Sequence, residues 1–280
     1  MLFYNVLSIV PPDDWNRTWA ADRTIMLRMT SKRAKEAIEN MKILDTVVKI
    51  NRKWWHTIST NADKKQQIII YHLQRMSLWC RISDLQLSNC QFKIDRLAIL
   101  LAQCPSLVHL DLSVNQTGQA TKNNIGTVLI QCPALTCLDL SLNFIEQAGL
   151  KSLAGVLGQF SALTRLNLSY IEIGDSGIKI IAPVLPQCTS LTHLNLGSTF
   201  IGNVGIDSIS RVLPYCTALI HLDLSRNYIN DEGANSIAYV LTQCSKLSHL
   251  DLSDNYIRYD GFDNLIEVFE QCPVLTSLLL

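Results

Sequence analysis

A short alternation of leucines and polar residues recurs along most of the chain after residue 80. It is clearest at residues 135–142, which read Leu-Thr-Cys-Leu-Asp-Leu-Ser-Leu. The first leucine of this phrase returns every 28 residues, at Leu107, Leu135, Leu163, Leu191, Leu219, Leu247 and Leu275. A weaker copy begins at Ile82, 25 residues before the first of these leucines. A fixed period of this length is typical of a solenoid built from stacked repeats.

Each repeat predicts a short strand, a turn and a helix. Leu138 and Leu140 fall on one side of an extended chain, whereas Cys137, Asp139 and Ser141 fall on the other. Asparagine then marks a turn at positions 115, 143, 227 and 255, and isoleucine stands two positions after the turn position at 145, 173, 201, 229 and 257. Glycine stands at positions 149, 177, 205, 233 and 261, where we expect it just ahead of the helix.

The helical part of the repeat has one apolar face. In residues 150–157 the apolar positions 150, 153, 154 and 157 give the i, i+3, i+4, i+7 spacing of an amphipathic helix. One unit cannot cover its own apolar face, so stacking must create the core. The pattern therefore predicts a curved parallel sheet on the inside of an arc, with the helices on the outside.

These units resemble leucine-rich repeats of the long, ribonuclease-inhibitor-like subtype, whose pattern is L-x-x-L-x-L-S-x-N-x-I-x-x-x-G. The resemblance covers residues 82–280 and implies an α/β leucine-rich repeat solenoid. Two adjacent repeats depart from it, because Ile171 and Thr199 replace the turn asparagine. In the family that amide bonds backbone groups of the turn, which isoleucine cannot do. We expect a locally weaker stack there.

The segment before the repeats resembles an F-box, the small helical module that docks onto the Skp1 adaptor of SCF-type ubiquitin ligases. The matching residues are Val10-Pro-Pro-Asp-Asp-Trp15 and the stretch from Asp22 to Arg33. Residues 7–41 are expected to form short helices, which gives a helical F-box-like head at residues 1–45. Residues 46–51 alternate like another strand and residues 61–79 have the pattern of a helix, so we expect an atypical capping repeat at residues 46–81. The regular repeats follow at residues 82–280. Adaptor docking is then expected at Pro11, Trp15, Leu27 and Met29. The alternative is a head that only covers the first repeat.

Charge and hydropathy narrow the functional classes. Residues 1–80 carry 13 Lys+Arg and 7 Asp+Glu, and residues 81–280 carry 11 and 17, so the two parts have net charges of +6 and −6. Acidic repeats argue against a nucleic-acid surface, which needs a basic footprint. No apolar run approaches the roughly 20 residues of a membrane-spanning helix. Residues 1–10 lack the basic start of a signal peptide and are assigned to the fold.

Nine cysteines are present, and six share one repeat position, at 104, 132, 188, 216, 244 and 272. Pairing between neighbouring repeats is not excluded by distance. The odd count and the missing secretion signal favour buried reduced thiols and a cytoplasmic or nuclear location. The apolar residues 278–280 would leave an open end, so the chain is either a fragment or relies on a partner there.

The exposed strand positions define a candidate protein-binding surface on the concave face. We expect it to contain His109, Asp111, Asp139, Arg165, Tyr170, His193, His221, Asp223, Arg226, His249 and Asp251. Three readings of the histidine row remain open. Each ring bonds the carboxylate of its strand neighbour, or the row contacts a partner, or it binds a metal ion, although adjacent parallel strands do not converge on tetrahedral geometry. A pH-sensitive contact is a further possibility.

Neither a cofactor nor a catalytic motif is indicated: the chain lacks a phosphate-binding G-x-x-x-x-G-K-[ST] loop, a G-x-S-x-G elbow and an H-E-x-x-H helix. We expect a non-enzymatic interaction scaffold, and more specifically an F-box-like substrate-recognition subunit. The alternatives are a free-standing binder or inhibitor and, from the repeat type alone, a regulator resembling Ran GTPase-activating proteins through Arg165 or Arg226.

Overall fold

The computed structural model describes residues 5–8, 45–49, 66–67, 70–71, 81–90, 94–115 and 125–280. Over these residues ten parallel strands form one open sheet in chain order. The strands are β1 (Asn5–Ser8), β2 (Asp45–Lys49), β3 (Arg81–Gln86), β4 (His109–Asp111), β5 (Cys137–Asp139), β6 (Arg165–Asn167), β7 (His193–Asn195), β8 (His221–Asp223), β9 (His249–Asp251) and β10 (Ser277–Leu279). The predicted α/β leucine-rich repeat solenoid is confirmed.

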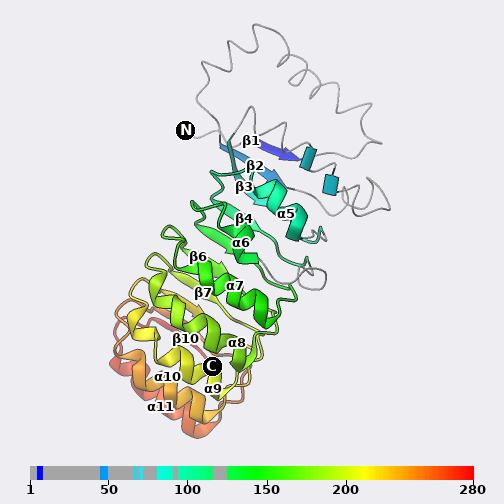
Figure 1. Cartoon of the computed structure of the whole chain (residues 1–280). Coiled ribbons are helices and arrows are strands. Elements are labelled where there is room, and N and C mark those ends of the chain that lie inside the picture. Colours follow the sequence, from blue (N-terminus) through cyan, green and yellow to red (C-terminus); the bar gives the residue numbers. More distant parts are fainter. Residues whose placement is uncertain are drawn as a thin grey trace, which may run out of the picture.

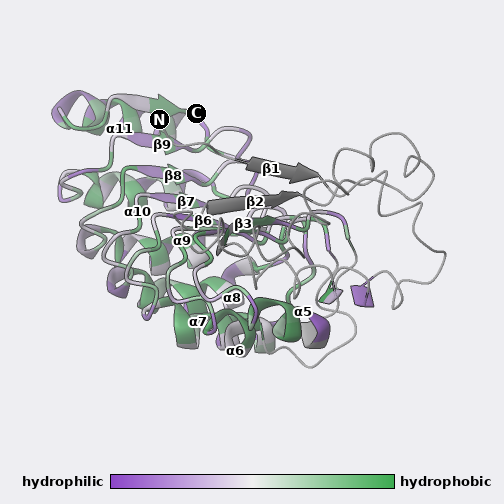
Figure 2. Ribbon diagram, turned by 90° about the horizontal axis from the view of Figure 1, so that it is seen from above, coloured by the Kyte–Doolittle hydropathy of each residue, from purple (hydrophilic) through white to green (hydrophobic). Residues whose placement is uncertain are grey.

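Helices cover one face of this sheet and follow its outer arc, while the strands lie inside (Figures 1 and 2). The α-helices are α5 (Ile94–Leu101), α6 (Ile125–Leu129), α7 (Gln147–Leu157), α8 (Gly174–Ile181), α9 (Asn203–Ser210), α10 (Asp231–Leu241) and α11 (Tyr259–Gln271). Within the described residues, η2 (Ala182–Gln187) and η3 (Leu213–Tyr215) are short 3₁₀ helices. Among the described helices, none covers the inner face of the sheet.

The leucine pattern builds the core between the sheet and the helices. Leu110, Leu138 and Leu166 lie opposite one another on β4, β5 and β6, and each is at most 1% exposed. Complete burial of a leucine side chain contributes about 1.5–3 kcal/mol. Each repeat completes the core of the next one, which explains why the hydrophobic positions recur with the period of the chain.

The repeated glycines lie inside the first helical turn, not just ahead of it as we expected. Gly205 is the third residue of α9, and its N–H donates to Asp175 Oδ1 of the preceding repeat at 2.9 Å. The same oxygen accepts the Gly202 N–H at 2.7 Å. A Cβ at position 205 would lie 2.6 Å from Asp175 Oδ1. Glycine therefore leaves room for a carboxylate that caps the helix of the next repeat.

Turn asparagines form a second set of bonds between repeats. Asn227 is 2% exposed, and its Nδ2 lies 2.9 Å from Leu196 O and 3.0 Å from Leu224 O. Its Oδ1 accepts the N–H groups of Thr199 and Ile201, each at 3.0 Å. The side chain thus pairs backbone groups of two consecutive turns, which would otherwise be buried without partners.

This pattern changes at the two repeats that lack the asparagine. Ile171 and Thr199 are fully buried, and Thr199 Oγ1 donates to Leu196 O at 2.6 Å. The backbone bends differently here, because the Gly174 N–H donates to Thr199 O and Gly174 has a φ of +58°. Phe200 also adopts a φ of +62°, which is uncommon for a residue with a side chain.

A left-handed residue ends each strand turn, a feature that the sequence pattern did not predict. The φ angle is between +54° and +60° at Asn89, Val114, Leu142, Tyr170, Ser198, Arg226 and Asp254. At most of these positions the N–H still donates to a carbonyl of the next repeat, for example from Leu142 to Ser169 O at 3.0 Å. The conformation ends the strand while keeping this inter-repeat bond.

The predicted head lies mostly outside the described residues. Within residues 1–45, Asn5–Ser8 form β1, which pairs with β2, so Leu7 and Ser8 are not the helical start that we expected. The strand expected over residues 46–51 is observed as β2. In the helix expected over residues 61–79, the described residues Gln66, Gln67, Ile70 and Tyr71 are helical.

Candidate functional site

The sheet places the predicted polar positions side by side on its inner face. His109, Cys137 and Arg165 are consecutive register partners on β4, β5 and β6. His193, His221 and His249 continue this row on β7, β8 and β9. All six side chains are half-buried or exposed. The alternation in the sequence therefore predicted correctly which residues share this row.

The three neighbouring histidines stack on one another. The ring centroids of His193 and His221 are 4.2 Å apart, and those of His221 and His249 are 4.0 Å apart. The Nδ1 atoms of His193 and His249 contact the hydroxyls of Thr192 at 2.8 Å and Ser248 at 2.7 Å. The expected pairing of these rings with neighbouring carboxylates is therefore wrong. His109 does lie beside a carboxylate of the neighbouring strand, because its Nδ1 is 3.5 Å from Asp84 Oδ2 on β3.

Burial and nearby positive charge make the His193 and His221 rings harder to protonate. Burial lowers the pKa of His193 below the ordinary value of 6.5, and His221, Arg165 and His249 lower it further. Burial also lowers the pKa of His221, with additional contributions from His249 and Arg165. Both rings are therefore neutral at pH 7.

The aspartates of the next row bind their own turns. Asp139 Oδ1 accepts the N–H of Ser141 at 2.8 Å and its hydroxyl at 2.6 Å, so this serine is buried and does not face the solvent as predicted. Asp111 Oδ1 accepts the N–H of Ser113 at 2.8 Å. Asp223 and Asp251 hold Ser225 and Ser253 in the same way. Where this position is Asn167, its Nδ2 donates to Asp139 Oδ2 at 2.9 Å.

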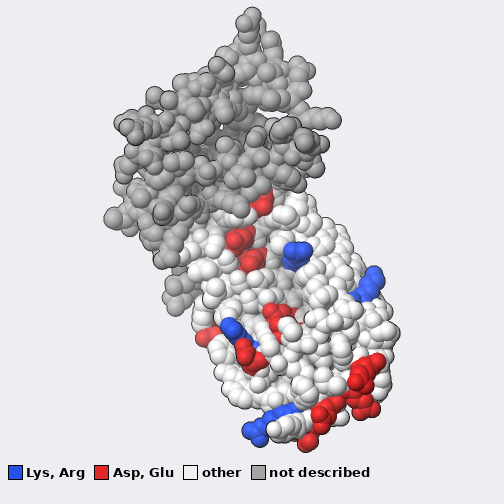
Figure 3. Space-filling view, turned by 180° about the vertical axis from the view of Figure 1, so that it is seen from behind, with Lys and Arg blue, Asp and Glu red and all other residues white. Residues whose placement is uncertain are grey.

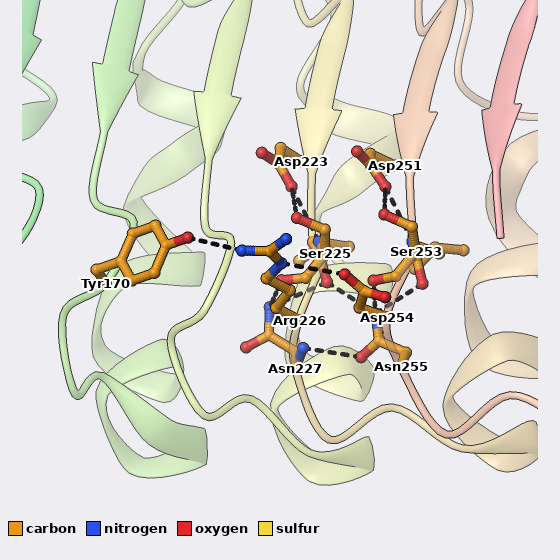
Figure 4. A network of polar contacts seen from close by, with 11 residues as sticks. Tyr170, Asp223, Ser225, Arg226, Asn227, Asp251, Ser253, Asp254 and Asn255 are labelled. Atoms are coloured by element: carbon orange, nitrogen blue, oxygen red, sulfur yellow. Dashed lines mark hydrogen bonds and ion pairs between the residues drawn. The ribbon is translucent and has the colours of Figure 1, made fainter.

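A third set of polar side chains, Tyr170, Arg226 and Asp254, belongs to the left-handed turn residues (Figure 4). Arg226 Nε donates to Asp254 Oδ2 at 3.0 Å, and Arg226 Nη1 donates to Tyr170 Oη at 3.1 Å. The bond to Tyr170 spans two repeats and passes the small residue Ser198. Because two partners hold the guanidinium, Arg226 is poorly suited to act as a free arginine toward a nucleotide.

The inner face forms an open hollow of about 480 Å³. It extends from β5 to β10 and includes the histidine row, Arg165 and the aspartates 139, 223 and 251. Seen from behind, the described surface is mostly uncharged, with small separate groups of acidic and basic side chains (Figure 3). In the parts of the chain that the structure describes, no group of three or more His, Cys, Asp or Glu is arranged to hold a metal ion.

A row of exposed aromatic rings follows the strand turns, and the sequence pattern alone did not single it out. Phe200, Tyr228 and Tyr256 are 47%, 51% and 62% exposed, and neighbouring ring centroids lie 5.7 and 5.9 Å apart. Each follows the turn asparagine or its replacement by one position, as does Phe144 at 40% exposed. This position was available as a signal, because exposed aromatics at one repeat position are enriched in interfaces.

Cysteines at the described positions are free thiols. Burial raises the pKa of Cys132 to about 12 and the pKa of Cys188 to about 11. Their S–H groups contact backbone carbonyls, for example Cys188 Sγ with Leu157 O at 3.6 Å. These thiols act as small core residues, as the sequence analysis favoured.

The adaptor-docking residues Pro11, Trp15, Leu27 and Met29 lie outside the described residues. Among the helices that are described, none has both the length and the apolar character needed to cross a membrane.

Comparisons with known proteins agree with this fold. Residues 131–154, 187–210, 215–238 and 243–263 match the Leucine Rich repeat family. These matches cover part of the array and agree with its leucine-rich repeat solenoid fold, and leucine-rich repeat proteins are in general non-enzymatic binding scaffolds. No curated protein matches the chain. A solved structure titled "Leiomodin-1 Actin-Binding Site 2 (ABS2)" is 20% identical, covers 45% of this chain and 73% of that chain, and has a TM-score of 0.38. That likeness concerns the fold alone.

Proposed function

We propose that the inner face of the repeats binds a protein partner. The observation that carries this proposal is the open hollow along β5 to β10, where variable polar side chains face outward from a uniform leucine core. A broad surface presented by a rigid array is suited to gripping another macromolecule. The exposed rings of Phe200, Tyr228 and Tyr256, which follow one another from repeat to repeat, add the kind of residue that dominates binding energy in protein interfaces.

Proximity labelling with the tagged full chain tests this surface in the source cells. We expect the double variant His221→Ala and Tyr228→Ala to lose specific neighbours, with affinities about tenfold weaker or more, because hot-spot truncations cost about 2 kcal/mol or more. The matched control is Tyr239→Ala, which removes an 80% exposed tyrosine from helix α10 on the outer side. Equal loss of neighbours in both variants would contradict the proposal.

The finer proposal is that the chain is an F-box-like substrate-recognition subunit of an SCF-type ubiquitin ligase, with repeats of the ribonuclease-inhibitor-like subtype. It is supported by the sequence resemblance between residues 10 and 33, and the repeats would then select the target. A pull-down with a Skp1-like adaptor tests it. Trp15→Ala together with Leu27→Ala should abolish capture, and failure of the intact chain to bind the adaptor would remove the ligase role.

A further inference from the structure

Four side chains enclose one end of the hollow. His221 and Asp223 lie on β8, and His249 and Asp251 lie opposite them on β9. All four line the hollow. Neighbouring strands are about 4.8 Å apart, and residues two positions apart along a strand are separated by about 7 Å. The four side chains therefore outline a rectangle, with imidazoles along one side and carboxylates along the other.

The hydrogen bonds around the histidine row fix how its protons are placed. Thr192 Oγ1 donates its one proton to Thr164 O at 2.9 Å, so the 2.8 Å contact with His193 must use a proton on Nδ1. Ser248 Oγ lies 2.7 Å from His249 Nδ1 and 3.5 Å from Ile220 O. In the neutral His193 ring Nε2 is then a hydrogen-bond acceptor.

The His221 ring is held by stacking and not by a hydroxyl contact. Its preceding residue, Ile220, has no hydroxyl, and the ring instead lies between those of His193 and His249. Burial lowers the pKa of His221 below 6.5, and His249 and Arg165 lower it further, which disfavours a positive charge on this ring at pH 7. Arg165 is two strands away on β6, so its charge lies toward the opposite end of the row.

The two carboxylates retain binding capacity. In each, Oδ1 accepts both the N–H and the hydroxyl of a serine, at 2.6–2.9 Å. Figure 4 shows the second oxygen of Asp223 and Asp251 directed away from that serine, and Arg226 turned toward Tyr170 and Asp254. Within the described residues, the ion pairs on this face are His109–Asp84 and Arg226–Asp254. Two like charges on adjacent strands thus face the hollow together.

We propose that this end of the hollow binds an arginine side chain of the protein partner, between Asp223 and Asp251 and against the His221 and His249 rings. The site offers acceptors in two directions, and a guanidinium supplies several N–H donors in a planar fork. Its flat face can also lie on an imidazole ring, which a lysine ammonium cannot reproduce. The inference deepens the proposed function and rests on it.

A direct test uses short peptides with the full-length chain. Ac-Gly-Arg-Gly-NH₂ is titrated against the protein while the imidazole ¹H–¹³C resonances of His221 and His249 are followed by NMR. Two peptides of the same length serve as comparisons. The lysine peptide keeps the positive charge without the planar group, and the citrulline peptide keeps a planar group without the charge. We expect saturable shifts with the arginine peptide at millimolar concentration, at least fivefold weaker binding of the lysine peptide, and no saturation with citrulline.

The double variant Asp223→Asn and Asp251→Asn should weaken arginine binding at least tenfold. Asparagine occupies the equivalent positions 167 and 195, where Oδ1 still accepts the backbone N–H of Ser169 or Gly197, so the variant retains the turn. Asp111→Asn on β4 removes the same charge outside the hollow and should leave binding unchanged. Lowering the pH to 5.5 should weaken binding at least fivefold through protonation of His221, because an imidazolium ion beside the site repels the guanidinium.

Each negative result has a defined meaning. Equal binding of citrulline or lysine, or an undiminished affinity in the Asp223→Asn and Asp251→Asn variant, overturns the arginine site. If the peptide does not bind but labelled neighbours are still lost with His221→Ala and Tyr228→Ala, the arginine site is wrong and the proposed function stands. If the arginine peptide binds as expected but the His221→Ala and Tyr228→Ala variant keeps all labelled neighbours, the arginine site is confirmed and the proposed partner surface is wrong.

Discussion

Two kinds of turn in the same solenoid pair their buried backbone groups in different ways. At Asn227 and Asn255 a side-chain amide joins each turn to its neighbours, and Asn227 Oδ1 in turn accepts N–H groups from the preceding repeat. At Ile171 and Thr199 that amide is missing, and the backbone uses its own groups with left-handed residues at Gly174 and Phe200. Identical strand patterns can therefore be stacked by side chains or by backbone bends.

The difference indicates where the array should open first. A turn with an asparagine satisfies several buried backbone groups and contains one left-handed non-glycine residue, whereas the interrupted pair contains an additional one at Phe200. Because a solenoid has mainly nearest-neighbour contacts, such a weak junction is not averaged over the whole molecule. The following variants test this comparison from the largest expected effect to the smallest.

Replacing a turn asparagine should have the largest effect on stability. Asn227→Ala deletes the contacts to Leu196 O and Leu224 O and leaves the N–H groups of Thr199 and Ile201 buried without an acceptor. We expect a loss of about 3 kcal/mol in the free energy of unfolding, measured by urea denaturation. Thr199→Ala, which deletes the hydroxyl contact to Leu196 O, should lose about 1 kcal/mol. Similar losses for both would contradict the comparison.

A carboxylate cap supports the interrupted pair from the helix side. Gly205→Ala places a methyl group against Asp175 Oδ1 and disturbs the bonds to the Gly202 and Gly205 N–H groups. We expect a loss of about 2 kcal/mol in thermal or urea unfolding. The control is Gly155→Ala in α7, where an added Cβ meets nothing within 4 Å and should stabilise the helix by about 0.5–1 kcal/mol. Equal signs for the two variants would exclude this role of Asp175.

Restoring the missing amide should strengthen the weak junction. Thr199→Asn provides an Nδ2 donor for neighbouring carbonyls and an Oδ1 acceptor, as Asn227 does one repeat later. We expect a gain of about 1 kcal/mol and slower amide hydrogen exchange in α8 and α9, while exchange in α10 is unchanged. An unchanged or lower unfolding midpoint would show that the backbone bend already satisfies this turn.

The repeat pattern predicted the buried leucines and the register of the inner face because both follow directly from a strict period. It did not predict the location of Gly205 inside a helix, because the reason is a carboxylate of another repeat, Asp175. The stacking of the His221 ring could not be predicted from the sequence either, because the register places the histidines on neighbouring strands without fixing their rotamers. Whether a histidine turns to a hydroxyl or a carboxylate depends on the preceding residue, which is Thr192 before His193 but Ile220 before His221.

The smallest expected effect concerns pH and the histidine row. The folded-state pKa values of His193 and His221 are lowered, so the unfolded chain binds protons first as the pH falls through about 6.5. Stability contributed by the neutral rings is therefore present above this pH and is lost below it. The unfolding midpoint of the wild type should fall more between pH 7.5 and 5.5 than that of His193→Gln with His221→Gln. Because the rings are partly exposed, the difference should be small, and a steeper decline in the variant would show that the row is not destabilised by protonation.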